Sequence, residues 1–340
     1  MSRETALGVV GATVAMVVVG GAIALRMLFG PGDEDAMERV HKARMEDEIK
    51  LEATYRRESE FIPSTDGARV FTQTWYPTIA PKGIVVVLHG VNGHSGLCTA
   101  HFNVLLRDGF IAAALDFRGF GRSAGRHGYI ASISDLADDT LAFVRRLRAQ
   151  HPDQSIFLCG GSMGGLVAVH VILKAPSLFH GLVLQAPALH IHAAARPPWI
   201  VEAVARILYA IAPKLPILGA VDARPIDPND AAQVALARVK QTDPLFYTGR
   251  MRLGTGLALL TATEAIAHRM HEVALPMLVQ HGDCDIIVRV DGSRRFHAAA
   301  ASTDKTLHVY SGGGHVLWVE PDAIAKPFFE DLTRWLQERV

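Results

Sequence analysis

The sequence predicts a protein of the α/β class, with a mostly parallel central sheet covered by helices on both faces. Two observations lead to this prediction. Short apolar segments of strand length alternate with helical segments from residue 83 to 185, and again from 257 to 338. Several of the short segments, such as GIVVVL at 83–88, are apolar at every position, which is typical of strands buried on both faces of a parallel sheet.

The elements follow from local signals along the chain. Residues 70–75 (VFTQTW) alternate as a half-buried strand does. Ser134 is expected to cap a helix that has acids in its first turns and arginines near its end. The further expected strands are 83–88, 110–115, 156–159, 182–185, 277–280 and 306–310, and the expected helices are 102–108, 134–150, 163–175, 257–271, 293–301 and 324–338.

The alternation of strand and helix breaks between about residues 187 and 254. This stretch is rich in proline and contains an apolar helical segment at 199–211. Ligands of open α/β sheets bind outside the carboxyl ends of the strands. We therefore expect the insertion to form a cap over that edge of a catalytic domain that spans residues 61–340.

The N-terminus differs from the rest of the chain. Residues 5–25 carry no charge, which is about the length of a transmembrane helix. We expect residues 1–30 to be an uncleaved single-pass membrane anchor and favour a cytosolic catalytic domain; a cleaved signal peptide is the alternative. Residues 31–60 carry mixed charges and are expected to form a solvated stalk, with a lipid-surface helix as the alternative.

Composition excludes several classes of function. The net charge of the 340 residues is zero, which disfavours nucleic acid as a partner. The three cysteines, at 98, 159 and 284, form no C-x-x-C pair, and His190-x-His192 has no plausible third ligand. We therefore expect no metal and no cofactor, while the oligomeric state stays open.

The residues Ser155 to Gly165 (SIFLCGGSMGG) carry the strongest chemical signal. The pattern Gly160-x-Ser162-x-Gly164 stands between an apolar strand and an apolar helix, as in a nucleophile elbow. Such a serine projects from a strained turn, and its neighbours are glycines because side chains there would collide. The sequence thus predicts Ser162 to be a nucleophile.

A serine nucleophile needs a base, and the base needs an orienting acid. In this order of elements the acid and then the histidine follow later strands. His315 follows the expected strand 306–310 and three glycines, so we expect it to be the base. Asp283 and Asp285 both follow strand 277–280, and local reasoning leaves the choice between them open.

Two backbone N–H groups are expected to form an oxyanion hole. One belongs to Met163, directly after the serine, and the other to Val91, in the loop after strand 83–88. His89 and Gly90 would shape that loop, and His94 is either a site residue or a structural one.

Five ordered motifs between Phe61 and Val340 resemble the monoacylglycerol lipase family of α/β-hydrolases, and in particular its plant-like branch with lysophospholipase-like members. They are HGVNGHSG (89–96), LDFRGFGRSAG (115–125), GGSMGG (160–165), HGDCDIIV (281–288) and GGGHVLWVEPD (312–322). The resemblance implies the α/β-hydrolase fold and a Ser162–Asp285–His315 triad. Gly161 departs from the family, which usually has His or Glu there.

The resulting hypothesis is hydrolysis of an acyl ester of a lipid through an acyl-enzyme, with a monoacylglycerol or a lysophospholipid as substrate. Trp199 and Ile207, on the apolar cap helix, are expected to contact the acyl chain, unless they form the core of the cap itself. Small or aromatic hydroxycinnamoyl-type esters are the alternative substrates. A binding protein without activity is disfavoured, because serine, acid and histidine are all present.

Overall fold

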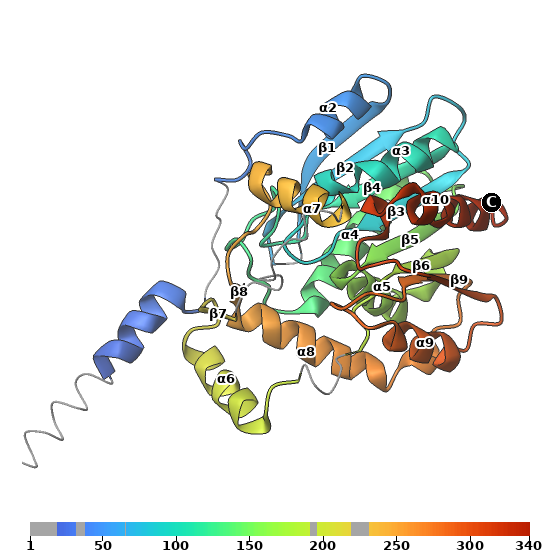
Figure 1. The fold of residues 1–340 in the computed structure, drawn as a ribbon. Coiled ribbons are helices and arrows are strands. Elements are labelled where there is room, and N and C mark those ends of the chain that lie inside the picture. The colour runs from blue at the N-terminus through green and yellow to red at the C-terminus, as the bar shows by residue number, and fades with distance from the viewer. Residues whose placement is uncertain (1–18, 32–37, 65, 191–195, 219–230) are drawn as a thin grey trace, which may run out of the picture.

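A computed structural model describes residues 19–31, 38–64, 66–190, 196–218 and 231–340 (Figure 1). Its centre is an eight-stranded sheet with the order β1-β2-β4-β3-β5-β6-β9-β10. The β1–β2 and β2–β4 pairs are antiparallel, and every later pair in this order is parallel. The strands are β1 (Arg56–Pro63), β2 (Arg69–Tyr76), β3 (Gly83–Leu88), β4 (Phe110–Leu115), β5 (Ile156–Gly161), β6 (Gly181–Gln185), β9 (Met277–Gly282) and β10 (Lys305–Tyr310).

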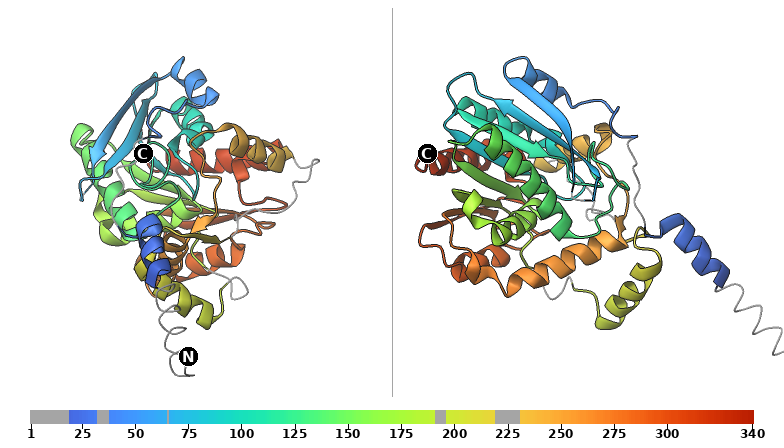
Figure 2. Two further views of the ribbon diagram at one scale, coloured as in Figure 1. Left: turned by 90° about the vertical axis from the view of Figure 1, so that its left-hand side faces the viewer. Right: turned by 180° about the vertical axis from the view of Figure 1, so that it is seen from behind.

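Helices cover both faces of this sheet, as the alternating pattern predicts (Figures 1 and 2). The apolar cores on the two faces are separate: α3 and α10 contribute to one, and α4, α5, α8 and α9 contribute to the other. The cap of α4 is Ser132, whose Oγ accepts from the Ser134 N–H at 3.0 Å, so the expected start at Ser134 is two residues late. The helices are α3 (Thr99–Arg107), α4 (Ile133–Gln150), α5 (Met163–Lys174), α8 (Leu253–Ala267), α9 (Val290–Ala299) and α10 (Asp322–Gln337).

Between β6 and α8 the chain leaves the sheet. The described elements of this insertion are α6 (Trp199–Ile211), β7 (Pro216–Leu218), α7 (Ala231–Thr242) and β8 (Met251–Arg252). The two helices go to different places: α6 lies beside α8 at one end of the molecule, whereas α7 lies near α2 (Glu46–Glu52) and α3 (Figure 1). This separation decides which part of the insertion covers the site.

The segment expected to be a solvated stalk packs instead on the catalytic domain. Residues 56–63 form edge strand β1, antiparallel to β2. Arg39 and Glu48 are both buried. Charged side chains on an edge strand face solvent, so β1 shows none of the alternation that marks a half-buried strand. The domain therefore begins well before residue 61.

The expected membrane anchor is corrected by the structure. No helix among the described residues is both long and apolar enough to cross a membrane, which overturns the predicted single-pass anchor and the location inferred from it. Residues 5–18 of the predicted span lie outside the described residues. The Phe29 carbonyl accepts from the Lys214 N–H at 3.1 Å, three residues beyond the end of α6.

Candidate active site

Ser162 lies in the sharp turn between β5 and α5, with φ 51° and ψ −119°. A residue with a side chain adopts such a conformation only where its surroundings hold it. Here the Ser162 N–H donates to the carbonyl oxygen of Gln185 at 2.9 Å, so the end of β6 fixes the turn.

The glycines around the serine differ in what their surroundings allow. A Cβ on Gly160 would lie 2.3 Å from the Gly164 carbonyl oxygen, and a Cβ on Gly164 would lie 2.1 Å from that of Leu88. Both positions therefore require glycine. At Gly161 the nearest atom would be the Gln185 carbonyl oxygen at 3.8 Å, so a side chain would fit there.

His315 and Asp285 meet across the loops that follow β10 and β9. Nδ1 of His315 lies 2.6 Å from Oδ2 of Asp285. The two strands are parallel neighbours, so both loops start from the same edge of the sheet. Asp283 has a different partner: it is exposed and accepts from the Gly312 N–H at 2.7 Å. Of the two acids that local sequence reasoning left open, Asp285 contacts the histidine.

Asp285 is held as a carboxylate by several donors. Its Oδ1 accepts from the N–H groups of Ile287 and Val288 at 2.8 and 2.9 Å, and its Oδ2 lies 3.2 Å from Nε2 of His281. Burial by itself raises the pKa of Asp285, but the hydrogen bonds from His281 and His315 outweigh it and hold the pKa well below its usual range. An ionised carboxylate in this place can orient the His315 ring and stabilise its protonated form.

The loop after β3 passes directly over the serine. A Cβ on Gly90 would lie 3.4 Å from Cβ of Ser162. His89 fixes this loop: its Nε2 accepts from the Phe117 N–H at 3.0 Å, so the proton is on Nδ1, which donates to the Gly90 carbonyl at 2.8 Å. Burial lowers the pKa of His89 to about 4, which keeps the ring neutral. Val91 follows, and Asn92 turns the chain with φ 68°.

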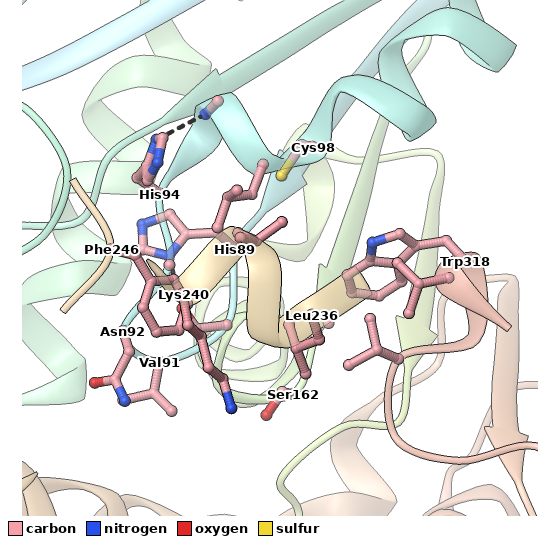
Figure 3. Close-up of a pocket in the computed structure, with 18 of the residues that line it drawn as sticks. His89, Val91, Asn92, His94, Cys98, Ser162, Leu236, Lys240, Phe246 and Trp318 are labelled. Carbon is pink, nitrogen blue, oxygen red and sulfur yellow. Dashed lines mark hydrogen bonds between the residues drawn. The ribbon is translucent and has the colours of Figure 1, made fainter. Parts of the chain in front are cut away.

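His94 ties the same loop to the inserted segment. Its Nε2 lies 2.7 Å from Oδ2 of Asp243, directly after α7, and its Nδ1 accepts from the Gly96 N–H at 3.1 Å (dashed in Figure 3). Burial raises the pKa of Asp243, but His94 and the Leu245 N–H outweigh it and lower that pKa. Both ring nitrogens of His94 are thus engaged within the protein, which is a structural role.

Ser162 and His315 line one cavity of about 600 Å³, a size typical of small-molecule sites. The loop after β3, the start of α3, helix α7 and the segments 246–249 and 315–319 form its walls. In Figure 3, α7 crosses the cavity and carries Leu236 and Lys240. The apolar side chains of the lining include Leu97, Leu236, Val239, Phe246, Ile287 and Trp318.

The structure brings most of the predicted site residues together and separates two of them. His89, Gly90, Val91 and His94 line the cavity, and Met163 is buried as the first residue of α5. Trp199 and Ile207 do not line it: they are 77% and 66% exposed on α6. Their predicted contact with an acyl chain is therefore corrected, because α7 and not α6 lies over the serine.

Sequence reasoning missed the contribution of α7. Leu236 and Val239 are three residues apart, which places both on one side of a helix. That spacing within the insertion is the signal that could have identified them.

The described residues contain no cluster of three or more histidine, cysteine or acidic side chains that could hold a metal ion. His192, of the His190-x-His192 pair, lies outside the described residues.

The fold and the site together define a class of protein. A mostly parallel sheet carries a serine at a strained strand-to-helix turn, with a histidine–carboxylate pair at the same sheet edge. This is the arrangement of an α/β-hydrolase with a nucleophile elbow.

Comparison with known proteins gives the family. Residues 79–322 match the family model Hydrolase_4, described as serine aminopeptidase, S33, and the chain belongs to that family. It is 30% identical to the monoacylglycerol lipase of Mycolicibacterium smegmatis, over 82% of this chain and 97% of that protein. It is 29% identical to the caffeoylshikimate esterase of Arabidopsis thaliana, over 84% and 86% of the two chains.

A similar fold occurs in the crystal structure of Paleococcus ferrophilus monoacylglycerol lipase. The TM-score is 0.69 at 25% identity, over 80% of this chain and 99% of that one. The resemblance to the monoacylglycerol lipase family is thus confirmed, and the chain is a serine ester hydrolase.

Proposed function

We propose that this enzyme hydrolyses monoacylglycerols to a free fatty acid and glycerol. Ser162 attacks the ester carbonyl while His315 takes its proton, and His315 then protonates the leaving glycerol. Asp285 orients the imidazole. The N–H groups of Val91 and Met163 bind the oxyanion of the tetrahedral intermediate. Water then releases the fatty acid from the acyl-enzyme by the same steps.

One observation carries the proposal: Ser162 and a histidine hydrogen-bonded to a carboxylate line the same cavity, and most of the cavity wall is apolar. The apolar wall favours a lipid as the substrate, because Leu236, Val239 and Phe246 can cover an acyl chain. Support for the glycerol ester comes from the relatives, since the M. smegmatis protein is a monoacylglycerol lipase.

The test is hydrolysis of monooleoylglycerol by the purified chain and its variants. We expect Ser162→Ala to lower kcat by a factor on the order of 10⁶ and to abolish labelling by a fluorophosphonate. Ser177→Ala is the matched control, since Ser177 is exposed and remote from the cavity. Retained activity in Ser162→Ala would disprove the assignment of the nucleophile.

A second candidate substrate is an aromatic ester of the hydroxycinnamoyl type. The similarity to the caffeoylshikimate esterase favours it. The indole of Trp318 lies beside Gly161 at the cavity wall, where it could stack against an aromatic acyl group near the serine. Comparing kcat/KM for monooleoylglycerol, a lysophosphatidylcholine and a caffeoyl ester decides among the three substrate classes, and the highest value identifies the preferred one.

A further inference from the structure

Arg39 lies before α2 and outside the region matched by the family model, yet its side chain reaches into the domain. The residue is 3% exposed. Its guanidinium donates to the carbonyl oxygens of Gly121, Ser123 and Gly125 at 2.8, 2.5 and 3.0 Å. Three acceptors on one loop are thus held by a single side chain.

The loop that Arg39 holds, residues 116–125, supports the loop after β3, residues 89–95, through two neighbouring residues at its own start. The Phe117 N–H donates to His89, the residue that fixes Gly90. Oδ1 of Asp116 accepts from the backbone N–H and the hydroxyl of Ser95 at 2.7 and 2.6 Å. Residues 89 and 95 flank Val91, so the position of the Val91 N–H depends on where residues 116–125 lie.

Internal hydrogen bonds connect the part of this loop that Arg39 holds with its start at Asp116: the Arg122 N–H donates to Oδ2 of Asp116 at 2.7 Å. Gly121 and Gly125 have φ of 51° and 101°, in the region that glycine populates freely. Carbonyl groups aligned on one side of such a loop need donors from another segment. A planar guanidinium can serve several of them at once, whereas a lysine ammonium is a single compact donor centre on a flexible stem.

We propose that Arg39 is a positioning residue for the oxyanion hole, so that the segment before α2 is part of the catalytic apparatus. This inference rests on the proposed esterase function. Arg39 touches no reacting atom; it acts through residues 116–125 on the backbone N–H of Val91. Because the oxyanion exists only in the transition state and the intermediate, loss of Arg39 lowers kcat and leaves KM nearly unchanged.

The test compares Arg39→Lys and Arg39→Ala with the wild type on a soluble p-nitrophenyl ester. We expect kcat to fall about 10- to 100-fold, and the affinity for a trifluoromethyl ketone, which forms a tetrahedral adduct, to fall in parallel. The pH profile of kcat/KM should keep its shape, because the His315–Asp285 pair is not touched. Arg44→Gln, which removes an exposed ion pair with Glu52, should leave kcat unchanged.

Loss of stability is separated from loss of positioning by a second control. Leu147→Ala removes a buried side chain near the carboxyl end of α4, away from the cavity. If Leu147→Ala loses as much kcat as the Arg39 variants at equal loss of Tm, or if the Arg39 variants keep wild-type kcat, the inference is wrong.

Hydrogen exchange gives a test that does not depend on activity. We expect Arg39→Ala to speed amide exchange in residues 89–98 and 116–125, with no change around Ser162. Unchanged exchange in both loops overturns the role of Arg39. A wild-type chain without ester hydrolysis contradicts the proposed function instead, and the exchange result still decides the role of Arg39.

Discussion

Replacing Gly164 by alanine gives the sharpest test of how the elbow is built. The added Cβ would lie 2.1 Å from the Leu88 carbonyl oxygen, and real Cβ atoms essentially never come within 3.0 Å of such an atom. Either α5 or the end of β3 must therefore shift by about 1 Å. Overpacking of this kind costs about 1–3 kcal/mol, although helix propensity alone predicts that alanine stabilises α5 by about 1 kcal/mol.

The same shift separates Ser162 from the loop after β3, which passes over it. A displacement of about 1 Å at a reacting group lowers the rate roughly 100-fold. We expect Gly164→Ala to lower Tm by roughly 2–6 °C in calorimetry and to lower kcat on a p-nitrophenyl ester about 100-fold. Gly161→Ala is the matched control, because its Cβ would meet nothing closer than 3.8 Å. A stabilised, active Gly164→Ala, or equal damage from Gly161→Ala, would refute the reasoning.

Three further predictions follow from the same structure. Asp285→Asn should lower kcat about 10⁴-fold while the exposed Asp283→Asn has little effect, as measured by burst and steady-state kinetics; equal losses would contradict the pairing of Asp285 with His315. Leu236→Ala should lower kcat/KM about 10-fold for long-chain esters but not for butyryl esters, whereas Trp199→Ala should leave kcat/KM unchanged for both; the opposite result would show that α6, not α7, binds the acyl chain. Burial lowers the pKa of His101 to about 4, below its unfolded value of about 6.5, so the unfolded state binds the proton first and stability is lost as pH falls from about 6.5 toward 4. Urea unfolding between pH 7.5 and 5 should therefore show a smaller loss of stability in His101→Leu than in the wild type, by about 2 kcal/mol at pH 5, and parallel curves would count against this linkage.

The parts of the fold that sequence reasoning predicted well are those with strong local signals. Residues 83–88 and 110–115 form β3 and β4 with the expected ends, because every side chain of a strand buried on both faces is apolar. Strand β1 was missed, because an edge strand can carry charges on most of its residues and then has no apolar period. The length and apolarity of residues 5–25 predicted an anchor that the described structure does not support.

Sequence reasoning also had a clear limit at the site. Asp283 and Asp285 are two residues apart on one loop. Only the direction of each side chain decides that Asp285 contacts His315 and that Asp283 accepts from Gly312. Trp199 belongs to the more apolar of the two cap helices, but apolarity does not say what a helix packs against. The contribution of Arg39 could not be predicted at all, because its three acceptors lie more than 80 residues away.

The sequence by itself determined the strands of the sheet other than the edge strand β1, and that loops carrying Ser162, Asp285 and His315 follow strands of that sheet. Apolar periodicity and glycine at sharp turns are local properties, so they can be read from neighbouring residues. Only the tertiary structure decided that α7 covers the cavity, that α6 stays exposed and that the segment before α2 joins the domain. These outcomes depend on contacts between segments far apart in the chain. Close packing and the pairing of buried polar groups decide which of several similar helices or side chains occupies each position.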